Sequence, residues 1–357
     1  VSMQVTHMRD LDLGVNTEHV VVIPAPRVRP DGADRASDLE VFKSALAQVP
    51  SVLEVAASQT VPGQGHNMGT DGIRLDGSDQ SVRGSITDVD ADFPGLYDLT
   101  LVAGRAFDGL SAPLEGEPIP VLATESMVAT LGFPAPEQAL GAGVTLSGRD
   151  AEIIGVLEDA HWSSAHQARE DAFLAFNPAG HQVSVKVGAD ALPQTLTALE
   201  DAYVSLFPGN PFQVTFVDAL FDAEYRADQR FATLFTLFAG LAVLIACLGL
   251  VGLAAFTAEQ RRKEIGVRKV LGASVASVVG LLSRDFVRLV LVGAVVATPV
   301  AWWVLSVWLE DYAYRIDLGP LPFVAAAGAA MIAAFVAVIS QSLRAAMTDP
   351  VRALRAE

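Results

Sequence analysis

The sequence predicts a membrane protein, with a mixed α+β extracytoplasmic domain followed by three transmembrane α-helices. One reason is charge: residues 1–230 hold 13 Lys and Arg against 33 Asp and Glu, whereas residues 231–357 hold 11 against 8. Another is the presence of three uncharged runs, 231–256, 289–309 and 318–343, each able to supply the roughly 20 helical residues that cross a bilayer. The acidic part is typical of a water-soluble domain and the apolar part is not.

Charges beside the apolar runs predict the orientation. The loop at 258–283 is basic, the loop at 310–317 is mainly acidic, and the tail after residue 343 is basic. Because Lys and Arg accumulate in short cytoplasmic loops, the basic loop and the C-terminus are expected in the cytoplasm. We therefore expect a multi-pass protein of the plasma (inner) membrane, with an extracytoplasmic domain at 1–225 and a membrane domain at 226–357. Its spans would lie at about 231–256, 286–309 and 318–343.

The extracytoplasmic part alternates between patterns typical of strands and of helices. Strands are predicted at 20–23, 52–58, 119–123, 151–157, 182–187 and 212–217, and short helices at 125–131 and 193–207. Leu39, Phe42, Leu46 and Val49 recur at helical spacing before Pro50, so an amphipathic helix should cover a sheet there, after a polar loop at 30–37. Gly, Asn and Asp crowd 62–77, which indicates a long loop or a hairpin. We expect a mixed α+β domain in two lobes.

The stretch 218–230 has no Pro or Gly and leads directly into the first apolar run. Helix should therefore continue from the extracytoplasmic domain into the membrane. No signal peptide and no preceding span come before this domain in the sequence, although translocation needs one. We expect the chain to be part of a longer membrane protein.

Four segments of the chain carry a resemblance to a known family: GLYDLTLVAGRAF (95–107), EIIGVLEDAHWSS (152–164), EIGVRKVLGAS (264–274) and DPVRALRAE (349–357). They resemble segments of MacB/FtsX-like ABC transporter permeases and occur in the order found in that family. The resemblance covers nearly the whole chain and implies a MacB-like periplasmic core domain followed by an FtsX-like permease domain. It corresponds to the C-terminal half of an eight-span member, or to a four-span member without its first span.

In the resembled family, the loop after the second span forms a short cytoplasmic coupling helix that rests on the ATPase subunit. The residues that carry this role over to the present chain are Arg261, Arg262, Lys263, Glu264, Ile265, Gly266, Val267, Arg268, Lys269, Leu271 and Gly272. Ile265, Val267, Val270 and Leu271 would form a narrow apolar stripe among five cations, and Gly272 would end the helix. The open alternative is a basic loop that contacts only lipid headgroups.

The resemblance implies a non-catalytic permease subunit that transmits movement from a cytoplasmic ATPase to the extracytoplasmic domain. No G-x-x-x-x-G-K-[ST] string occurs, so ATP hydrolysis is expected on a separate partner. Expected contacts are that ATPase, membrane lipid and a second permease half, with no cofactor and no nucleic acid. Export of peptides, antibiotics or lipoprotein-like substrates is the main expectation. The alternatives are signalling or regulation of a cell-wall hydrolase without transport, and a membrane-anchored binding protein with no ATPase.

Two acidic segments suggest metal sites, but neither matches the residue pattern of a common metal site. Asp88, Asp90 and Asp92 begin an EF-hand-like string, but Phe93 and Leu99 occupy the positions that need Gly and Glu, so a turn of solvated carboxylates is expected.

The second segment contains Glu158, Asp159, His161 and His166, whose spacing matches no common zinc site. We expect His161 and Trp162 to be packed in a loop after a strand.

Overall fold

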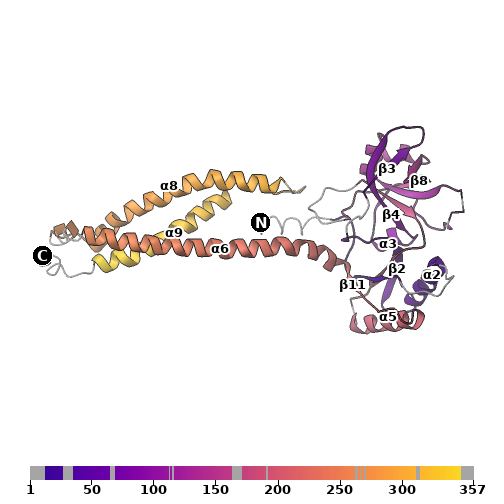
Figure 1. Ribbon diagram of the computed structural model, residues 1–357, viewed down its shortest axis with the longest axis horizontal. Helices are drawn as coiled ribbons and strands as arrows, with labels where there is room; N and C mark the ends of the chain where they lie inside the picture. Colours follow the sequence, from indigo (N-terminus) through magenta and orange to yellow (C-terminus); the bar gives the residue numbers. More distant parts are fainter. Residues whose placement is uncertain are drawn as a thin grey trace. The chain divides into compact units, whose positions relative to one another are not determined.

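The computed structural model describes residues 13–26, 35–64, 69–111, 113–114, 116–162, 171–189, 192–261, 264–265, 267–268, 271–310 and 314–346. The chain divides into two compact units, one with strands and one with long helices (Figure 1). The main boundary lies between Asp228 and Gln229. The first unit contains the strands and the second contains the long apolar helices.

The first unit is built on one 11-stranded sheet. Its strands are β1 (Val20–Pro24), β2 (Val52–Ser58), β3 (Gly69–Leu75), β4 (Ser81–Val89), β5 (Leu101–Gly104), β6 (Ile119–Thr124), β7 (Gly143–Leu146), β8 (Arg149–Leu157), β9 (Ala172–Phe176), β10 (Gln182–Val187) and β11 (Thr215–Phe216). Its helices are α2 (Arg35–Leu46), α3 (Phe93–Leu96), α4 (Glu125–Thr130), α5 (Leu192–Leu206) and a 3-10 helix at Pro136–Ala139.

The sheet has two lobes, as expected. In one lobe β11, β1, β10 and β2 pair antiparallel in that order. In the other, β4, β3, β7, β8, β6 and β9 follow one another, and β9 pairs back with β4 to close a ring. The register pair Ser58↔Val89 joins β2 to β4. Closing a sheet on itself leaves the ring without free edges at these strands.

Helix α2 forms where the apolar spacing predicts it. Leu39, Phe42 and Leu46 are buried, and the Phe42 ring lies edge-on to Tyr203 of α5 with 5.6 Å between centroids. Both helices contribute to one core cluster with β1, β2 and β10. The expected polar loop at 30–37 was too long, since residues 35–37 already belong to α2.

The ring contains strands that the sequence did not indicate. β3 lies in the segment expected as a loop or hairpin, and β3 and β4 do form a hairpin. β4, β7 and β9 were not expected at all, and neither was β5, which pairs with β8 outside the ring. β4 carries Gly84 where a side chain would collide, because a Cβ there would lie 2.2 Å from Met127 Cε. The last expected strand, at 212–217, is reduced to Thr215–Phe216 because Val217 already begins a helix.

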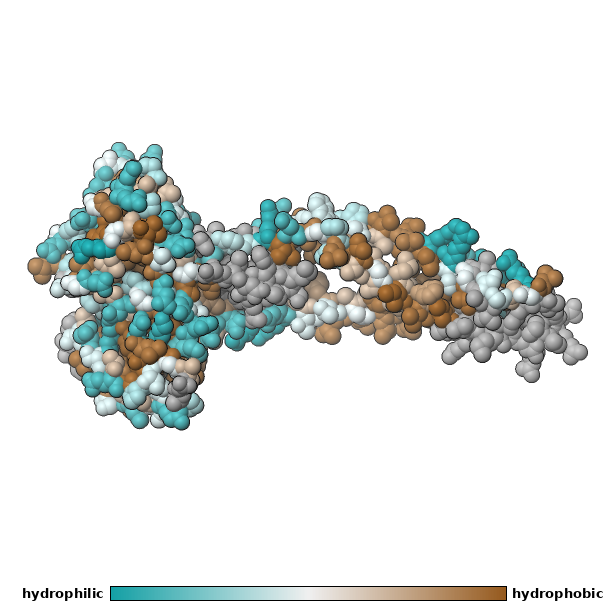
Figure 2. Space-filling view, turned by 180° about the vertical axis from the view of Figure 1, so that it is seen from behind, coloured by the Kyte–Doolittle hydropathy of each residue, from teal (hydrophilic) through white to brown (hydrophobic). Residues whose placement is uncertain are grey.

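Three long helices follow: α6 (Val217–Gln260), α8 (Val275–Leu309) and α9 (Leu321–Ala346). α6 is one continuous helix across the boundary between the two units, as predicted from the missing Pro and Gly. Segments able to cross a membrane are Gln229–Gln260, Ser283–Leu309 and Leu321–Ile339. Apolar side chains gather on the surface of the helical unit (Figure 2), as expected of helices that face lipid.

Candidate functional site

Four of the described residues that follow α6 are helical. Glu264, Ile265, Val267 and Arg268 have helical backbone, and the Ile265 N–H donates to the Arg261 carbonyl at 2.9 Å. Five predicted or neighbouring positions lie outside the described residues: Arg262, Lys263, Gly266, Lys269 and Val270. We call Arg261 to Gly272 the coupling segment.

The turn ends at Gly272, as the sequence predicts. Gly272 has φ +91°, and the Ala273 N–H donates to the Arg268 carbonyl at 3.0 Å across it. This six-to-one bond around a left-handed residue is a Schellman ending, which glycine adopts without the steric penalty of a Cβ. Two residues later Ser274 caps α8, its Oγ accepting from the Ser277 N–H at 3.3 Å. The coupling segment is therefore fixed at its C-terminal end by a tight turn into α8.

The described charged side chains of the coupling segment form two ion pairs. Arg268 Nη2 donates to Glu264 Oε1 at 2.7 Å, one helical turn away. Arg261 Nη2 donates to Asp285 Oδ2 of α8 at 3.3 Å. The second pair ties the end of α6 to α8. The sequence analysis did not single out Asp285. An acidic residue directly after a basic loop could have indicated it, because it can pair with one of the loop's cations.

A small buried cluster lies close to this second pair. Ala254 of α6, Phe286 of α8 and Val338 of α9 are each less than 7% exposed and pack together, with Leu250 against them. Arg261 follows Ala254 by seven residues, about 10 Å along a helix, and Asp285 directly precedes Phe286. All three long helices thus meet beside the Arg261–Asp285 pair.

The apolar residues of the coupling segment differ in exposure. Ile265 is 7% exposed and packs inside the chain, whereas Val267 is 51% and Leu271 is 81% exposed. Of the described apolar residues in the expected stripe, Val267 and Leu271 therefore offer the surface that another protein could cover.

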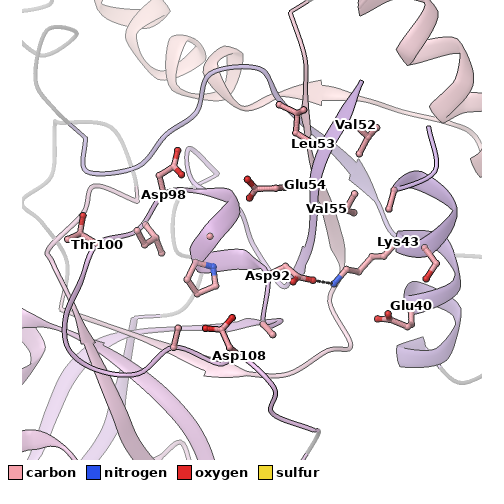
Figure 3. Close-up of a pocket in the computed structure, with 17 residues that line it drawn as sticks. Glu40, Lys43, Val52, Leu53, Glu54, Val55, Asp92, Asp98, Thr100 and Asp108 are labelled. Carbon is pink, nitrogen blue, oxygen red and sulfur yellow. Dashed lines mark hydrogen bonds and ion pairs between the residues drawn. The ribbon is translucent and has the colours of Figure 1, made fainter. Parts of the chain in front are cut away.

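The first unit contains a second feature of interest, an open cleft of about 850 Å³ between α2, β2 and α3 (Figure 3). We call it the acidic cleft because five carboxylates and one lysine line it, namely Glu40, Glu54, Asp92, Asp98, Asp108 and Lys43. A volume of this size is ordinary for a ligand site.

Lys43 anchors one wall of the acidic cleft. Its Nζ donates to Asp90 Oδ2 at 2.5 Å and to Asp92 Oδ2 at 2.7 Å. Burial by itself would lower the pKa of Lys43, but the charges and hydrogen bonds of Asp90 and Asp92 outweigh it, and the pKa lies above its ordinary value. Asp90 Oδ2 also accepts from the Ala57 N–H at 2.7 Å, and Oδ1 from the Phe93 N–H at 3.1 Å.

The expectation of a solvated turn at Asp88, Asp90 and Asp92 was therefore wrong for two of the three. The Asp90 side chain is 5% exposed and the Asp88 side chain 15%, whereas Asp92 is 61% exposed. Asp88 accepts from Arg149 at 3.2 Å and from Asn177 at 3.0 Å. These carboxylates are buried because partners distant in sequence satisfy them.

Asp98, at the other wall of the cleft, joins three segments. Its Oδ2 accepts from Asn16 Nδ2 at 2.7 Å and from Lys186 Nζ at 3.1 Å. The Asn16 hydrogen bond is the main reason that the pKa of Asp98 lies below its ordinary value, with partial burial opposing it and Lys186 adding to it.

The second acidic segment is packed, as expected for His161 and Trp162, which are both 3% exposed. Asp159 Oδ1 accepts from the Ser126 N–H at 2.9 Å, and His166 lies outside the described residues. Within the described part of the chain, no three His, Cys, Asp or Glu side chains are grouped closely enough to hold a metal ion.

The sequence matches known protein families over both units. Residues 4–205 match the family model of the MacB-like periplasmic core domain, and residues 236–350 match that of the FtsX-like permease C-terminal domain. The pyoverdine export ATP-binding/permease protein PvdT of Pseudomonas fluorescens is 22% identical over 94% of this chain and 50% of its own length. The macrolide export ATP-binding/permease protein MacB of Rhodospirillum rubrum is 22% identical over 96% of this chain and 52% of its own length.

This chain spans about half the length of these curated relatives. Among solved structures, the periplasmic region of MacB from Actinobacillus actinomycetemcomitans matches 61% of this chain and 97% of that one, at 16% identity and a TM-score of 0.39. The matched core domain alone covers more than half of the present sequence. The chain therefore belongs to the family of FtsX-like permeases that carry a MacB-like periplasmic core domain.

Proposed function

We propose that this chain acts as the permease part of an ATP-driven exporter, and that the coupling segment receives movement from an ATPase. The observation that carries the proposal is the Arg261–Asp285 pair beside the buried cluster of Ala254, Phe286 and Val338. A push on a segment held in this way would act on all three long helices together. α6 is one continuous helix from Val217 to Gln260, so it is the direct covalent route along which movement would pass from one unit to the other.

ATP hydrolysis would come from outside these 357 residues, on a partner subunit. The relatives PvdT and MacB are named ATP-binding/permease proteins, which supports pairing with an ATP-binding part. In this proposal the coupling segment and the C-terminus face the cytoplasm, and the first unit lies outside the plasma membrane. The basic coupling segment fits this orientation because Lys and Arg are retained on the cytoplasmic side.

The proposed cargo is a peptide, an antibiotic or a lipoprotein-like molecule, handled by the extracytoplasmic domain. Two relatives carry names for the export of pyoverdine and of macrolides, which supports export in general. A dimer of permease halves would give each ATPase of a pair its own coupling segment. The alternative use of the same architecture is signalling or cell-wall-hydrolase regulation, in which the movement reaches a bound protein instead of a cargo.

Site-specific photo-crosslinking tests this function. A benzoylphenylalanine placed at Leu271 (81% exposed) should capture a protein with a phosphate-binding ATPase motif in native membranes. The matched control is the same residue at Leu114, which is 72% exposed in the first unit. Capture of the ATPase from Leu271 and not from Leu114 supports the proposal. Crosslinks from Leu271 to lipid alone would overturn it in favour of a simple basic loop.

A further inference from the structure

One edge of β2 is open along the acidic cleft. β2 pairs with β10 along its whole length on one side, and with β4 at Ser58↔Val89 on the other. The Ala57 N–H donates to Asp90 Oδ2, and the Ala57 carbonyl accepts from the Asp90 N–H at 2.9 Å, both on the side away from β10. Because backbone groups alternate in direction along a strand, Val55 presents its N–H and carbonyl on that same side. Among the described residues, no strand pairs with this side of β2 from Val52 to Val55.

The acidic cleft follows this open edge. Val52, Leu53, Glu54 and Val55 all line it, between α2 and α3 (Figure 3). Leu53, where the register with β10 shifts, has an exposed side chain at 64%. Natural proteins protect open strand edges, since an extended chain can pair with them. Here the edge is reached through a cleft of about 850 Å³, which has room for an added strand.

The charge around the open edge selects the kind of chain that could pair. Asp and Glu make up five of the 17 residues that line the cleft. In residues 1–230 as a whole they make up 33 of 230, so their share in the cleft is about twice as high. Lys43 is already bound to Asp90 and Asp92. The side-chain carboxylates of Glu40, Glu54 and Asp108 make no hydrogen bond or ion pair with another described residue. Their charges are therefore available to an incoming cation.

We propose that the acidic cleft binds an extended basic segment of a partner protein, which adds to the open edge of β2 as a further strand. The partner's main chain would bond to Val55, and its Lys or Arg side chains would meet Glu40, Glu54 and Asp108. Its apolar side chains would cover Leu53. Strand addition of this kind takes affinity from main-chain hydrogen bonds and specificity from side chains. This inference does not depend on the coupling segment or on an ATPase.

A labelled ten-residue peptide of alternating Lys and Val tests the site, using the full chain in nanodiscs of zwitterionic lipid. Fluorescence anisotropy should show saturable binding. The same peptide, N-methylated at every second amide, keeps its charge. It lacks the backbone N–H groups that would donate hydrogen bonds to the edge of β2, so it should bind at least about tenfold more weakly. Equal binding of the two peptides would overturn strand addition, and equal binding of a Gln–Val peptide would overturn the charge match.

Variants of the chain locate the binding. Glu40→Gln, Glu54→Gln and Asp108→Asn together should weaken the Lys–Val peptide about tenfold, because exposed ion pairs contribute roughly two- to threefold each. The matched control is Glu137→Gln, Asp150→Asn and Glu152→Gln, three exposed carboxylates outside the cleft, which should leave binding unchanged. Equal weakening by the two sets would mean that the domain's general acidity attracts the peptide, and the proposed site would be wrong. Competition by spermine as strong as that by the peptide would also contradict it, since a polyamine cannot add a strand.

Discussion

Arg261 and Asp285 form an ion pair, with 3.3 Å between Nη2 and Oδ2, that ties the end of α6 to α8. The two side chains are 38% and 53% exposed, so the pair stabilises the fold by only about 0–1 kcal/mol. The pair matters for its position, since it joins the first residue of the coupling segment to α8 next to the cluster of Ala254, Phe286 and Val338.

Reversing one charge of this pair should disturb coupling more than stability. Arg261→Asp or Asp285→Arg should each lower permease-dependent ATP hydrolysis several-fold while shifting the thermal unfolding midpoint little. The double exchange Arg261→Asp with Asp285→Arg should restore most of the hydrolysis, because it rebuilds the attraction with the opposite polarity. Hydrolysis in proteoliposomes measures this. No rescue by the double exchange would mean that the two residues act separately.

Gly272→Ala should destabilise the coupling segment. A non-glycine residue at φ +91° costs about 1–2 kcal/mol, although an added Cβ would meet no atom within 4 Å. The matched control is Gly280→Ala in α8, where a Cβ also meets nothing and the helical backbone favours alanine by up to about 1 kcal/mol. Hydrogen exchange at Leu271 and Ala273 should speed up in the first variant and not in the second.

Lys43→Met should destabilise the first unit strongly. Removing the lysine leaves Asp90, whose side chain is 5% exposed, without its counter-ion, a loss typically of about 3–5 kcal/mol. Lys186→Met is the matched control, because its partner Asp98 is 56% exposed and remains hydrated, so its cost should stay near 1 kcal/mol or below. Chemical unfolding of the full chain measures both. Similar losses in the two variants would show that burial of Asp90 is not what makes Lys43 important.

Asp98 should contribute stability in a pH-dependent way. Its pKa is lowered mainly by the Asn16 hydrogen bond, so its contribution is present at pH values above the ordinary carboxyl pKa and is lost as the pH falls through the lowered value. Because the side chain is 56% exposed, the expected size is below about 1 kcal/mol. Asp98→Asn suits this test, since residue 98 has φ +54° and Asn tolerates the left-handed region. The stability difference from the parent chain should shrink in acid, and a constant difference would contradict the assignment.

The sequence predicted those structural elements that are determined by residues close together in the chain. The spacing of Leu39, Phe42 and Leu46 indicated α2, the absence of Pro and Gly indicated that α6 is continuous, and Gly272 indicated where the coupling turn ends. Each of these depends on neighbours within one or two turns of the chain.

The parts missed depend on residues far apart in sequence. β9 pairs in parallel with β4, more than 80 residues away, and all five of its residues are buried, so it shows no alternation. Asp90 was expected to be solvated, but its partner Lys43 precedes it by 47 positions in the sequence. Asp285 was not singled out, and its partner Arg261 precedes it by 24 positions. Sequence spacing alone cannot indicate such partners.

We propose that an ATPase acts on this chain through the coupling segment. The most direct measurement is ATP hydrolysis by the ATPase captured at Leu271, reconstituted in liposomes with either the parent chain or Leu271→Asp. A charge on this side chain, 81% exposed, should leave the fold intact but disfavour an apolar contact. The parent chain should change the hydrolysis rate, Leu271→Asp should remove most of this change, and the matched variant Leu114→Asp should keep it. If Leu271→Asp keeps the full effect, the ATPase does not act through this part of the coupling segment.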